Sequence, residues 1–495
     1  MRLAYQQQPR LDCPAVNAVQ LNVKCRDEII PILRALQHTY GDEALRHEIL
    51  NAVGKDVNRG SSRKHGREGL DYWSITVLAA VRLGCNLDYD KLQDLAEQHR
   101  NLRLIMGIGD WQENVNFDWR RIRDNVCLLR PETLTKINQS IVAAGHKLVP
   151  DAIKAVRGDT FVVETNIHYP TESSLIGDGL RKVVTLAAAL AAEHNLPGWR
   201  QGQHLLHQVK KILGAIARAA RAKRQGAERL QPGYQKLLAL AEELLDRARQ
   251  LLRVLAHPID RDGIDWLGVG TGGREQELLH YLRLTEKVCS TARRRVLQGE
   301  SVPNEEKIFS IFEPHTELIN RGKQPDPIQY GHKVFVIEDA VGFICHYEVM
   351  CDGLLDQDAV VPTMTKLQKR MSGKIERASF DRAFHTPDNQ EKLAEIVPHP
   401  CIAKKGHIGG RQQQLEATVE FRQARQNHPG IESAIGALQA GNGQERCRDK
   451  TKRGYERYVG LGILGRNLHV LGKLLLAEDD AACQAAKSKR KKQAG

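Results

Sequence analysis

Three acidic residues stand in contexts that could place a carboxylate at a reaction centre. Asp159 opens an alternating apolar run, Gly158 to Ile167, which is typical of a buried strand. Asp381 directly follows a short apolar stretch that predicts a second strand, and Glu432 lies in the first turn of a predicted helix. Taken singly, each is as well explained as an ordinary turn or helix-start carboxylate.

Taken together, the three residues suggest a metal site. Two divalent ions about 3.5 to 4 Å apart need several hard oxygen ligands, which three carboxylates converging from two strand ends and one helix can supply. One ion would activate a water or a 3′-hydroxyl, and the other would stabilise the leaving oxygen. The pattern Asp159, Asp381, Glu432 therefore favours phosphodiester chemistry with Mg²⁺ or Mn²⁺, two ions per active site.

The composition favours a polyanionic partner. The chain has 495 residues, 73 Lys and Arg against 60 Asp and Glu, and a formal net charge of +13. Nucleic acid is the first candidate, although a generically basic protein has the same charge. We expect a soluble, cytoplasmic protein, because the sequence has no long uninterrupted apolar segment and no signal-peptide pattern. The 10 cysteines lack C-x-x-C spacing, which indicates neither a disulfide framework nor a zinc site.

Residues 1–145 have the hydrophobic periodicity of a compact helical module of helix-turn-helix size, which we interpret as DNA-binding. Sequence readout is expected from the predicted helix at 88–99 or from the arginine-rich segment at 119–123. A basic, glycine-rich segment at 58–69 is either a solvated loop or an arm that follows the phosphate backbone. Its cationic residues are Arg59, Arg63, Lys64 and Arg67.

The remaining chain divides into an α/β core and a helical insert. Residues 146–179 and 300–478 predict the two parts of the core, with strands at 332–337, 343–350 and 377–380 and a helix at 387–396. Residues 180–299 predict an inserted bundle of long helices, and 479–495 predict a basic, disordered tail. Basic residues on the insert either form a solvated helix face or contact DNA; they include Lys210, Lys211, Arg218 and Arg221.

Three stretches resemble a bacterial insertion-sequence transposase of the ISNCY family, over nearly the whole chain. They are GDTFVVETNIHYPTESSLIGDGLR from Gly158, SFDRAFHTPDNQEKL from Ser379, and PGIESAIGAL with the following ERCRDK and GYERYVGLGILGRNLHVLG. The resemblance implies a DDE transposase with an RNase H-like mixed-sheet core, in which Asp159, Asp381 and Glu432 are the catalytic residues and metal ligands. Asn166, His168, Arg382, His385 and Asn467 also match the family pattern, and each is either an accessory residue or a structural hydrogen-bonding group. Arg382 and His385 are the two of these that we expect to contact DNA.

The resemblance further implies that double-stranded DNA is the partner, as both transposon ends and target. The enzyme would bind terminal inverted repeats, nick the ends and transfer the 3′-hydroxyl as at least a homodimer. Gln439 stands where related sequences often have a lysine, so that phosphate contact is either missing or supplied by Arg446 or Arg448. Two alternatives stay open: an RNase H-like nuclease without strand transfer, and a DNA-binding protein that has lost catalysis.

Overall fold

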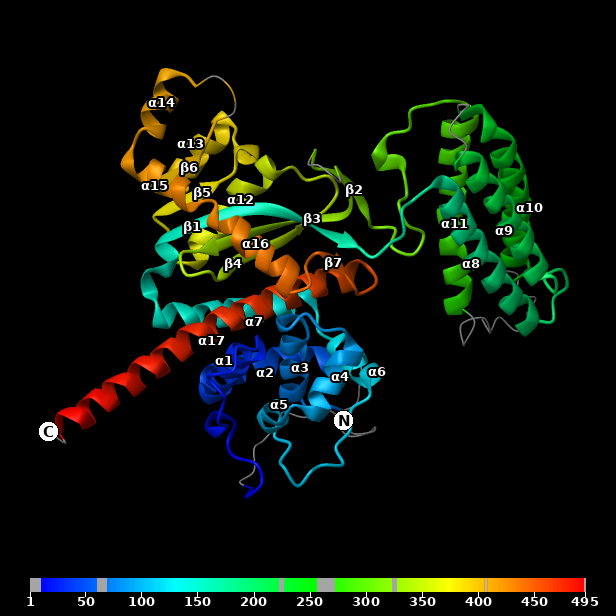
Figure 1. Cartoon of the computed structure of the whole chain (residues 1–495). Coiled ribbons are helices and arrows are strands. Elements are labelled where there is room, and N and C mark those ends of the chain that lie inside the picture. Colours follow the sequence, from blue (N-terminus) through cyan, green and yellow to red (C-terminus); the bar gives the residue numbers. More distant parts are fainter. Residues whose placement is uncertain are drawn as a thin grey trace, which may run out of the picture. The chain divides into compact units, whose positions relative to one another are not determined.

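The chain forms two compact units. The computed structural model describes residues 10–59, 69–221, 227–255, 272–322, 327–404, 406 and 408–493. One unit comprises residues 1–166 and 331–495, and the other comprises residues 167–330. Figure 1 labels the helices and strands of both units. All three predicted carboxylates belong to the first unit.

The N-terminal part of the first unit is helical, which confirms the prediction for its secondary structure. Four of its helices begin at an aspartate whose side chain accepts a backbone N–H of the first turn: Asp42, Asp71, Asp88 and Asp118. After a short 3-10 turn at Val16–Ala18, the helices are α1 (Ile29–Gly41), α2 (Glu43–Val57), α3 (Tyr72–Gly84), α4 (Tyr89–Gln98), α5 (Arg100–Ile105), α6 (Trp119–Val126) and α7 (Pro131–Leu148).

A mixed sheet forms the centre of this unit. A 3-10 turn, η2 (Pro150–Lys154), leads into the central strand, β1. β1 pairs antiparallel with β3 and parallel with β5; β4 pairs antiparallel with β3, and β6 pairs parallel with β5. A short strand, β7, pairs with the end of β1. The bounds are β1 (Ala155–Thr165), β3 (Ile328–Asp339), β4 (Ile344–Met350), β5 (Arg377–Phe380), β6 (His399–Ile402) and β7 (Arg446–Cys447).

Helices cover both faces of the sheet. On one face, Phe335 of β3 packs against Phe384, whose ring centroid is 5.2 Å away, beside α12 (Asp356–Arg370) and α13 (Pro387–Ile396). On the other face, α16 (Gly430–Gly441) lies over β1, and the Tyr455 hydroxyl of α17 donates to the carbonyl oxygen of Val163 at 2.6 Å. The shorter elements between them are η7 (Arg382–Phe384), α14 (Gly410–Glu416) and α15 (Val419–Asn427).

The last helix, α17 (Lys452–Gln493), joins the sheet to the N-terminal helices. It contacts α1, α3 and α7, and it crosses α3 so closely that a Cβ on Gly465 would lie 2.6 Å from the Cα of Gly84. The segment 452–488 is long and apolar enough to cross a membrane, but 72% of its most apolar window is buried inside the protein. This burial is consistent with a core helix of a soluble protein.

The prediction of a disordered tail at 479–495 differs from the structure, in which α17 continues to Gln493. The sequence after Asp480 is rich in alanine, the residue with the highest helix propensity, so the helix extends beyond its packed part. Asp479 also pairs with Arg34 of α1 at 2.7 Å. Residues 494 and 495 lie outside the described residues.

The second unit is a bundle of four long helices with its own core, as the periodicity predicted. Its helices are α8 (Glu172–Glu193), α9 (Gly202–Arg221), α10 (Gln231–Leu255) and α11 (Gly272–Ala292). A capping box between Thr171 and Ser174 begins α8. Two short 3-10 turns, η3 (Ala227–Arg229) and η6 (Asn304–Glu306), and a π-helical turn, η5 (Arg293–Leu297), connect or follow these helices. The strand β2 (Glu317–Asn320) comes next and is the neighbour of β3 in the mixed sheet.

Candidate active site

Asp159 lies on β1, and Asp381 directly follows the last residue of the adjacent strand β5. Gly158 of β1 pairs with Phe380 of β5 in parallel register, so the next residue on each chain is one of these carboxylates. Because side chains alternate between the faces of a sheet, both point to the side opposite Gly158 and Phe380. Asp159 lies in the middle of β1, whose pairing begins at Ala155, rather than at its start as predicted. Asp381 caps η7 and accepts the N–H of Arg382 at 2.6 Å.

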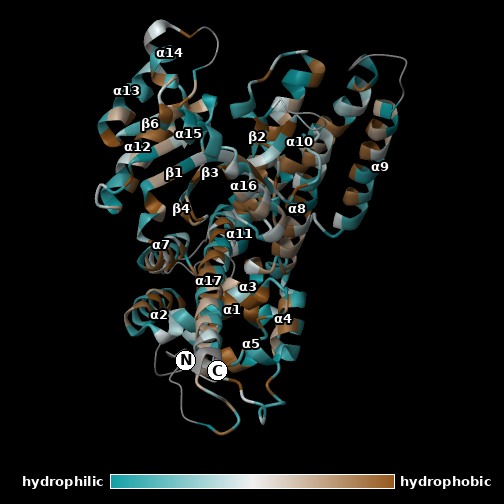
Figure 2. Ribbon diagram, turned by 60° about the vertical axis from the view of Figure 1, so that its left-hand side comes forward, coloured by the Kyte–Doolittle hydropathy of each residue, from teal (hydrophilic) through white to brown (hydrophobic). Residues whose placement is uncertain are grey.

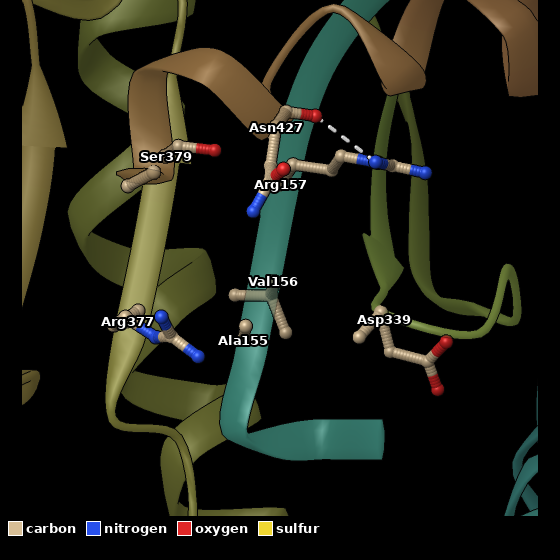
Figure 3. Close-up of a pocket in the computed structure, with 9 residues that line it drawn as sticks. Ala155, Val156, Arg157, Asp339, Arg377, Ser379 and Asn427 are labelled. Atoms are coloured by element: carbon tan, nitrogen blue, oxygen red, sulfur yellow. Dashed lines mark hydrogen bonds between the residues drawn. The ribbon is translucent and has the colours of Figure 1, made fainter. Parts of the chain in front are cut away.

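Glu432 lies in the first turn of α16, the helix that lies over β1. Arg157, two residues before Asp159 and therefore on the same face, holds the start of this helix. Its Nη1 donates to the carbonyl oxygen of Asn427 at 3.0 Å (Figure 3). A Cβ on Gly430 would lie 2.1 Å from that nitrogen, so a larger residue there would require the guanidinium or the chain before α16 to shift. The sheet therefore positions the helix that bears Glu432.

A buried ion pair fixes Arg157 itself. Its Nε donates to Oε2 of Glu338 on β3 at 2.7 Å, and Arg466 of α17 lies 3.7 Å from the other oxygen of that carboxylate. Burial raises the pKa of Glu338, while the two guanidinium groups, Arg157 first, oppose the shift. Glu338 thus anchors the residue that supports α16.

His428 lies between the strand and helix parts of the site. Its Nδ1 is 3.2 Å from the hydroxyl oxygen of Ser379 on β5. Burial lowers the pKa of His428, and the carboxylates of Asp381 and Glu432 oppose this shift. Both carboxylates therefore lie within electrostatic reach of one imidazole, at the same end of the sheet face that bears Asp159.

The donor set of the three carboxylates fits Mg²⁺ or Mn²⁺. All ligand atoms are oxygens, and Asp381 and Glu432 are exposed while Asp159 is half-buried, so a partly hydrated ion has access. Among the described residues, the ligand atoms of Asp159, Asp381 and Glu432 are not all within 4.8 Å of one another. The ligand atoms of His146, Asp339 and Cys345 do lie this close together. That second group offers nitrogen and sulfur and suits neither ion.

A cavity of about 230 Å³ adjoins Arg157 (Figure 3). Its lining includes Asp339, Arg377, Ser379 and Asn427 but none of the three predicted carboxylates. It lies toward the start of β1 and β5, beneath the end of α15. The cavity therefore adjoins the contact between Arg157 and Asn427 before α16. It is not the predicted site, whose carboxylates lie further along the chain from these strand residues.

The residues predicted to contact DNA near the core have different surroundings. Arg382 is exposed and adjoins Asp381, whereas His385 is half-buried and burial lowers its pKa. Arg446 forms an ion pair with Glu164 at 2.8 Å. Arg448 donates to the side chain of Asn86 and the hydroxyl of Tyr458, at 2.7 and 2.9 Å. The guanidinium of Arg448 thus connects the loop between α3 and α4 to α17.

Asn467, which also matched the family pattern, is fully buried. Its side-chain nitrogen donates to Asn138 and its oxygen accepts the N–H of Ile344. This residue links α17 to α7 and β4. Arg59 is exposed just after α2, whereas Arg63, Lys64 and Arg67 lie outside the described residues.

The basic residues of α9 form one stripe in the second unit. Lys211, Arg218 and Arg221 follow each other at helical spacing on the side opposite Leu205, Val209 and Ile216, and Lys210 lies beside them. All four are exposed, and none forms an ion pair within the part of the chain that is described. Figure 2 shows α9 alternating between hydrophilic and hydrophobic segments.

Sequence reasoning did not identify Arg157, Gly430 or His428 as supporting residues. Arg157 directly precedes Gly158-Asp159, and His428-Pro429-Gly430 directly precedes the helix of Glu432. The sequence did contain one signal for Arg157: it lies two residues before Asp159, and therefore on the same face of the predicted strand. Its partner on α15 depends on the tertiary fold.

No family model matches this chain, and no curated protein or solved structure matches it. The functional conclusion therefore rests on the geometry of the carboxylates and on the sequence motifs.

Proposed function

We propose that this protein is a DNA transposase that uses Asp159, Asp381 and Glu432 for metal-dependent phosphodiester chemistry. One observation carries the proposal: one aspartate on β1 and one directly after the parallel strand β5 follow a paired couple of residues, beside a helix whose first turn bears a glutamate. Asp381 and Glu432 are exposed and Asp159 is half-buried, and carboxylates that lie near each other repel unless cations bind between them. Their position next to a basic residue, Arg382, also favours a phosphate-bearing substrate.

The architecture supports an RNase H-like core. The central strand β1 is antiparallel to β3 and parallel to β5, so the sheet is mixed, with helices on both faces. The chain leaves this sheet after β1 and returns to it at β2, the neighbour of β3, with the four long helices α8 to α11 between them. This organisation agrees with an interrupted catalytic core.

The mechanism assigns separate tasks to the residues of the site. Two Mg²⁺ or Mn²⁺ ions, when bound, would supply Lewis-acid activation of a water or 3′-hydroxyl and stabilisation of the leaving oxygen. Asp159 and Asp381 would hold these ions from the sheet, and Glu432 would hold them from α16. Arg157 binds the end of α15, directly before α16, to β1 and would thereby help to position Glu432, which matters because a small misplacement of a reacting group costs much of the rate.

We assign phosphate contacts to the α9 stripe because its charges have no protein partner among the described residues. The arginines at the end of α11 differ: Arg293 pairs with Glu242, Arg294 with Glu300 and Glu306, and Arg295 with Glu172. Paired arginines gain little from a phosphate, because they must first give up a carboxylate. The helical module at 1–145 remains our choice for recognition of the transposon ends, with Arg59 at its surface.

The stripe can be tested by charge removal. Changing Lys210, Lys211, Arg218 and Arg221 to Ala should lower the slope of log K against log salt by about 0.9 for each lost contact. The matched control replaces Arg293, Arg294 and Arg295 with Ala and should leave the slope unchanged. Equal slopes for the stripe variant and the wild type would mean that α9 does not contact DNA.

We propose that the enzyme acts in the cytoplasm on chromosomal DNA, as at least a homodimer. Each chain has one set of the three carboxylates, and two transposon ends must be processed together. Complex size on paired ends, measured by light scattering, tests this stoichiometry. A single chain on two ends would contradict it.

A strand-transfer assay tests the function directly. Purified protein is incubated with labelled DNA from the ends of the element that encodes it, a supercoiled target plasmid and Mn²⁺. Covalent joining of a donor 3′-end to the plasmid is the expected result. Cleavage without joining would indicate a nuclease, and binding without either would indicate a protein that has lost catalysis.

A further inference from the structure

A second cavity, of about 480 Å³, lies in the first unit between α7 and the end of α12. Its lining includes Lys136, Lys147, Arg370 and Lys374, against one carboxylate, Glu48. Glu48 already accepts the hydroxyl hydrogen of Ser140 at 2.9 Å. The cavity therefore has a net positive lining. It is separate from the three predicted catalytic carboxylates, none of which lines it.

The base of this cavity holds an arginine without an anionic partner. The guanidinium of Arg370 donates to the carbonyl oxygen of Cys345, and its Nε is buried with no hydrogen-bond partner. Within the described residues no carboxylate lies within ion-pair distance of it. Burial lowers the pKa of Arg370, which means that the protein does not compensate its charge. Arg370 is half-buried, and arginines withdrawn from water are normally paired, so an anion would complete this environment.

The lysines around the opening are available as well. Lys136 and Lys374 are exposed, and in the described ranges neither forms an ion pair. Lys147 is 74% exposed and lies 3.7 Å from Asp42, a separation that contributes little in water. A ligand with several oxygens can contact the lysines and Arg370 at once. Phosphate is the common biological anion with this geometry and charge.

A cation would not fit beside this arginine. His146, Asp339 and Cys345 bring three ligand atoms together at the edge of the cavity, but Asp339 is already satisfied. One of its oxygens accepts three backbone N–H groups of the turn between β3 and β4, and the other is 2.8 Å from Nε2 of His146. That group therefore stabilises the turn, and the positive lining repels a metal ion.

We propose that this cavity is a phosphate-binding site, with Arg370 at its base and Lys136 and Lys374 at its opening. The proposal does not depend on the transposase function, because it involves none of the catalytic carboxylates. The phosphate belongs either to the backbone of bound DNA or to a free phosphate compound such as a diphosphate. Both sources offer the same tetrahedral oxyanion to the same three side chains.

The test uses the full-length protein and inorganic pyrophosphate at low salt, measured by titration calorimetry. We expect binding by the wild type and about tenfold weaker binding for each removed lysine in the Lys136→Ala/Lys374→Ala variant. The control, Lys366→Ala/Lys369→Ala, removes two exposed lysines of α12 that do not line the cavity, and it should bind as the wild type does. All three proteins should have the same far-UV circular dichroism spectrum, since the four lysines are exposed.

A competition experiment identifies the source of the phosphate. If a short DNA duplex displaces pyrophosphate from the wild type, the site receives the DNA backbone; if both bind independently, it receives a free phosphate compound. Absence of any pyrophosphate binding at millimolar concentration would overturn the proposal. Equal weakening in the Lys136/Lys374 variant and in the control would overturn it too. The catalytic proposal would survive either result, because strand transfer is measured separately.

Discussion

Two pairs of carboxylates next to the same sheet have opposite surroundings. Glu338 and Asp339, at the end of β3, are 1% and 0% exposed, and arginine, histidine or backbone N–H groups surround them. Asp381 and Glu432 are exposed, and across the described residues neither has an ion-pair partner. A buried carboxylate with all its partners stabilises the fold, whereas an exposed one without them is available to a ligand. Replacing the first kind should therefore affect stability, and replacing the second kind should affect activity.

The largest expected effect is on catalysis. Asp159→Asn, Asp381→Asn and Glu432→Gln should each lower strand transfer by about a thousandfold or more, because each removes a ligand charge from the metal site. DNA affinity should not change, and the melting temperatures of the Asp381 and Glu432 variants should stay near that of the wild type. The control Asp388→Asn removes an exposed carboxylate of α13 that pairs with Lys392. Two of the three variants retaining activity within about tenfold would contradict a shared site.

The next effect concerns the helix that bears Glu432. Gly430→Ala places a methyl group against the guanidinium of Arg157, so either this guanidinium loses its present contacts or the start of α16 moves. We expect strand transfer to fall by about a hundredfold, since a displacement of about 1 Å is sufficient for such a loss.

A second glycine of the same helix provides the matched control. A Cβ on Gly436 meets nothing within 4 Å, so Gly436→Ala should keep full activity and raise the free energy of unfolding by about 0.5 to 1 kcal/mol. Similar activity for the two variants would mean that the contact between Arg157 and the start of α16 does not position Glu432.

The third effect is on stability. Glu338→Ala removes the carboxylate that pairs with Arg157 and Arg466, so their positive charges lose this partner. We expect the free energy of unfolding to fall by about 3 kcal/mol. Urea unfolding followed by circular dichroism measures this difference. Glu395→Ala, an exposed position on α13, is the control and should change stability by less than about 0.5 kcal/mol. Equal stability of both variants would remove the distinction between the two pairs of carboxylates.

The smallest effect is a pH dependence from a half-buried histidine of α17, His469. Burial, with Lys473 and Arg466 nearby, lowers the pKa of His469 to about 4. The unfolded chain has a histidine pKa of about 6.5, so the folded state binds fewer protons and loses stability as pH falls below that value.

The replacement His469→Gln isolates this contribution. Between pH 7 and pH 5 the wild type should lose about 1 kcal/mol more stability than the variant, after allowance for solvent screening. Chemical unfolding at the two pH values measures the difference. Parallel losses in both proteins would show that His469 titrates normally.

Local patterns predicted the secondary structure well. The strand at Arg377–Phe380 and the helix at Pro387–Ile396 have the predicted bounds, because each has a clear alternation or a proline at its start. The hairpin of β3 and β4 was also predicted, since a glycine-containing turn separates two apolar runs. These features depend on neighbours within a few residues.

Features that depend on tertiary contacts were not predicted. Arg448 was expected to contact phosphate, but Asn86 and Tyr458, from two distant segments, hold its guanidinium. The support of α16 by Arg157 depends on the register of β1 and on the approach of α15. Sequence spacing identified the three carboxylates as candidates, while the adjacency of Asp159 and Asp381 follows from the pairing of Gly158 with Phe380.

The most decisive measurement is Mn²⁺ binding to the intact protein, followed by electron paramagnetic resonance. The wild type should bind Mn²⁺, with two ions per chain once DNA ends are present, because the phosphate then supplies further ligands. Asp381→Asn and Glu432→Gln should each lose this binding, and Asp388→Asn should retain it. If the Asp381 and Glu432 variants bound Mn²⁺ as tightly as the wild type, the three carboxylates would not form one metal site.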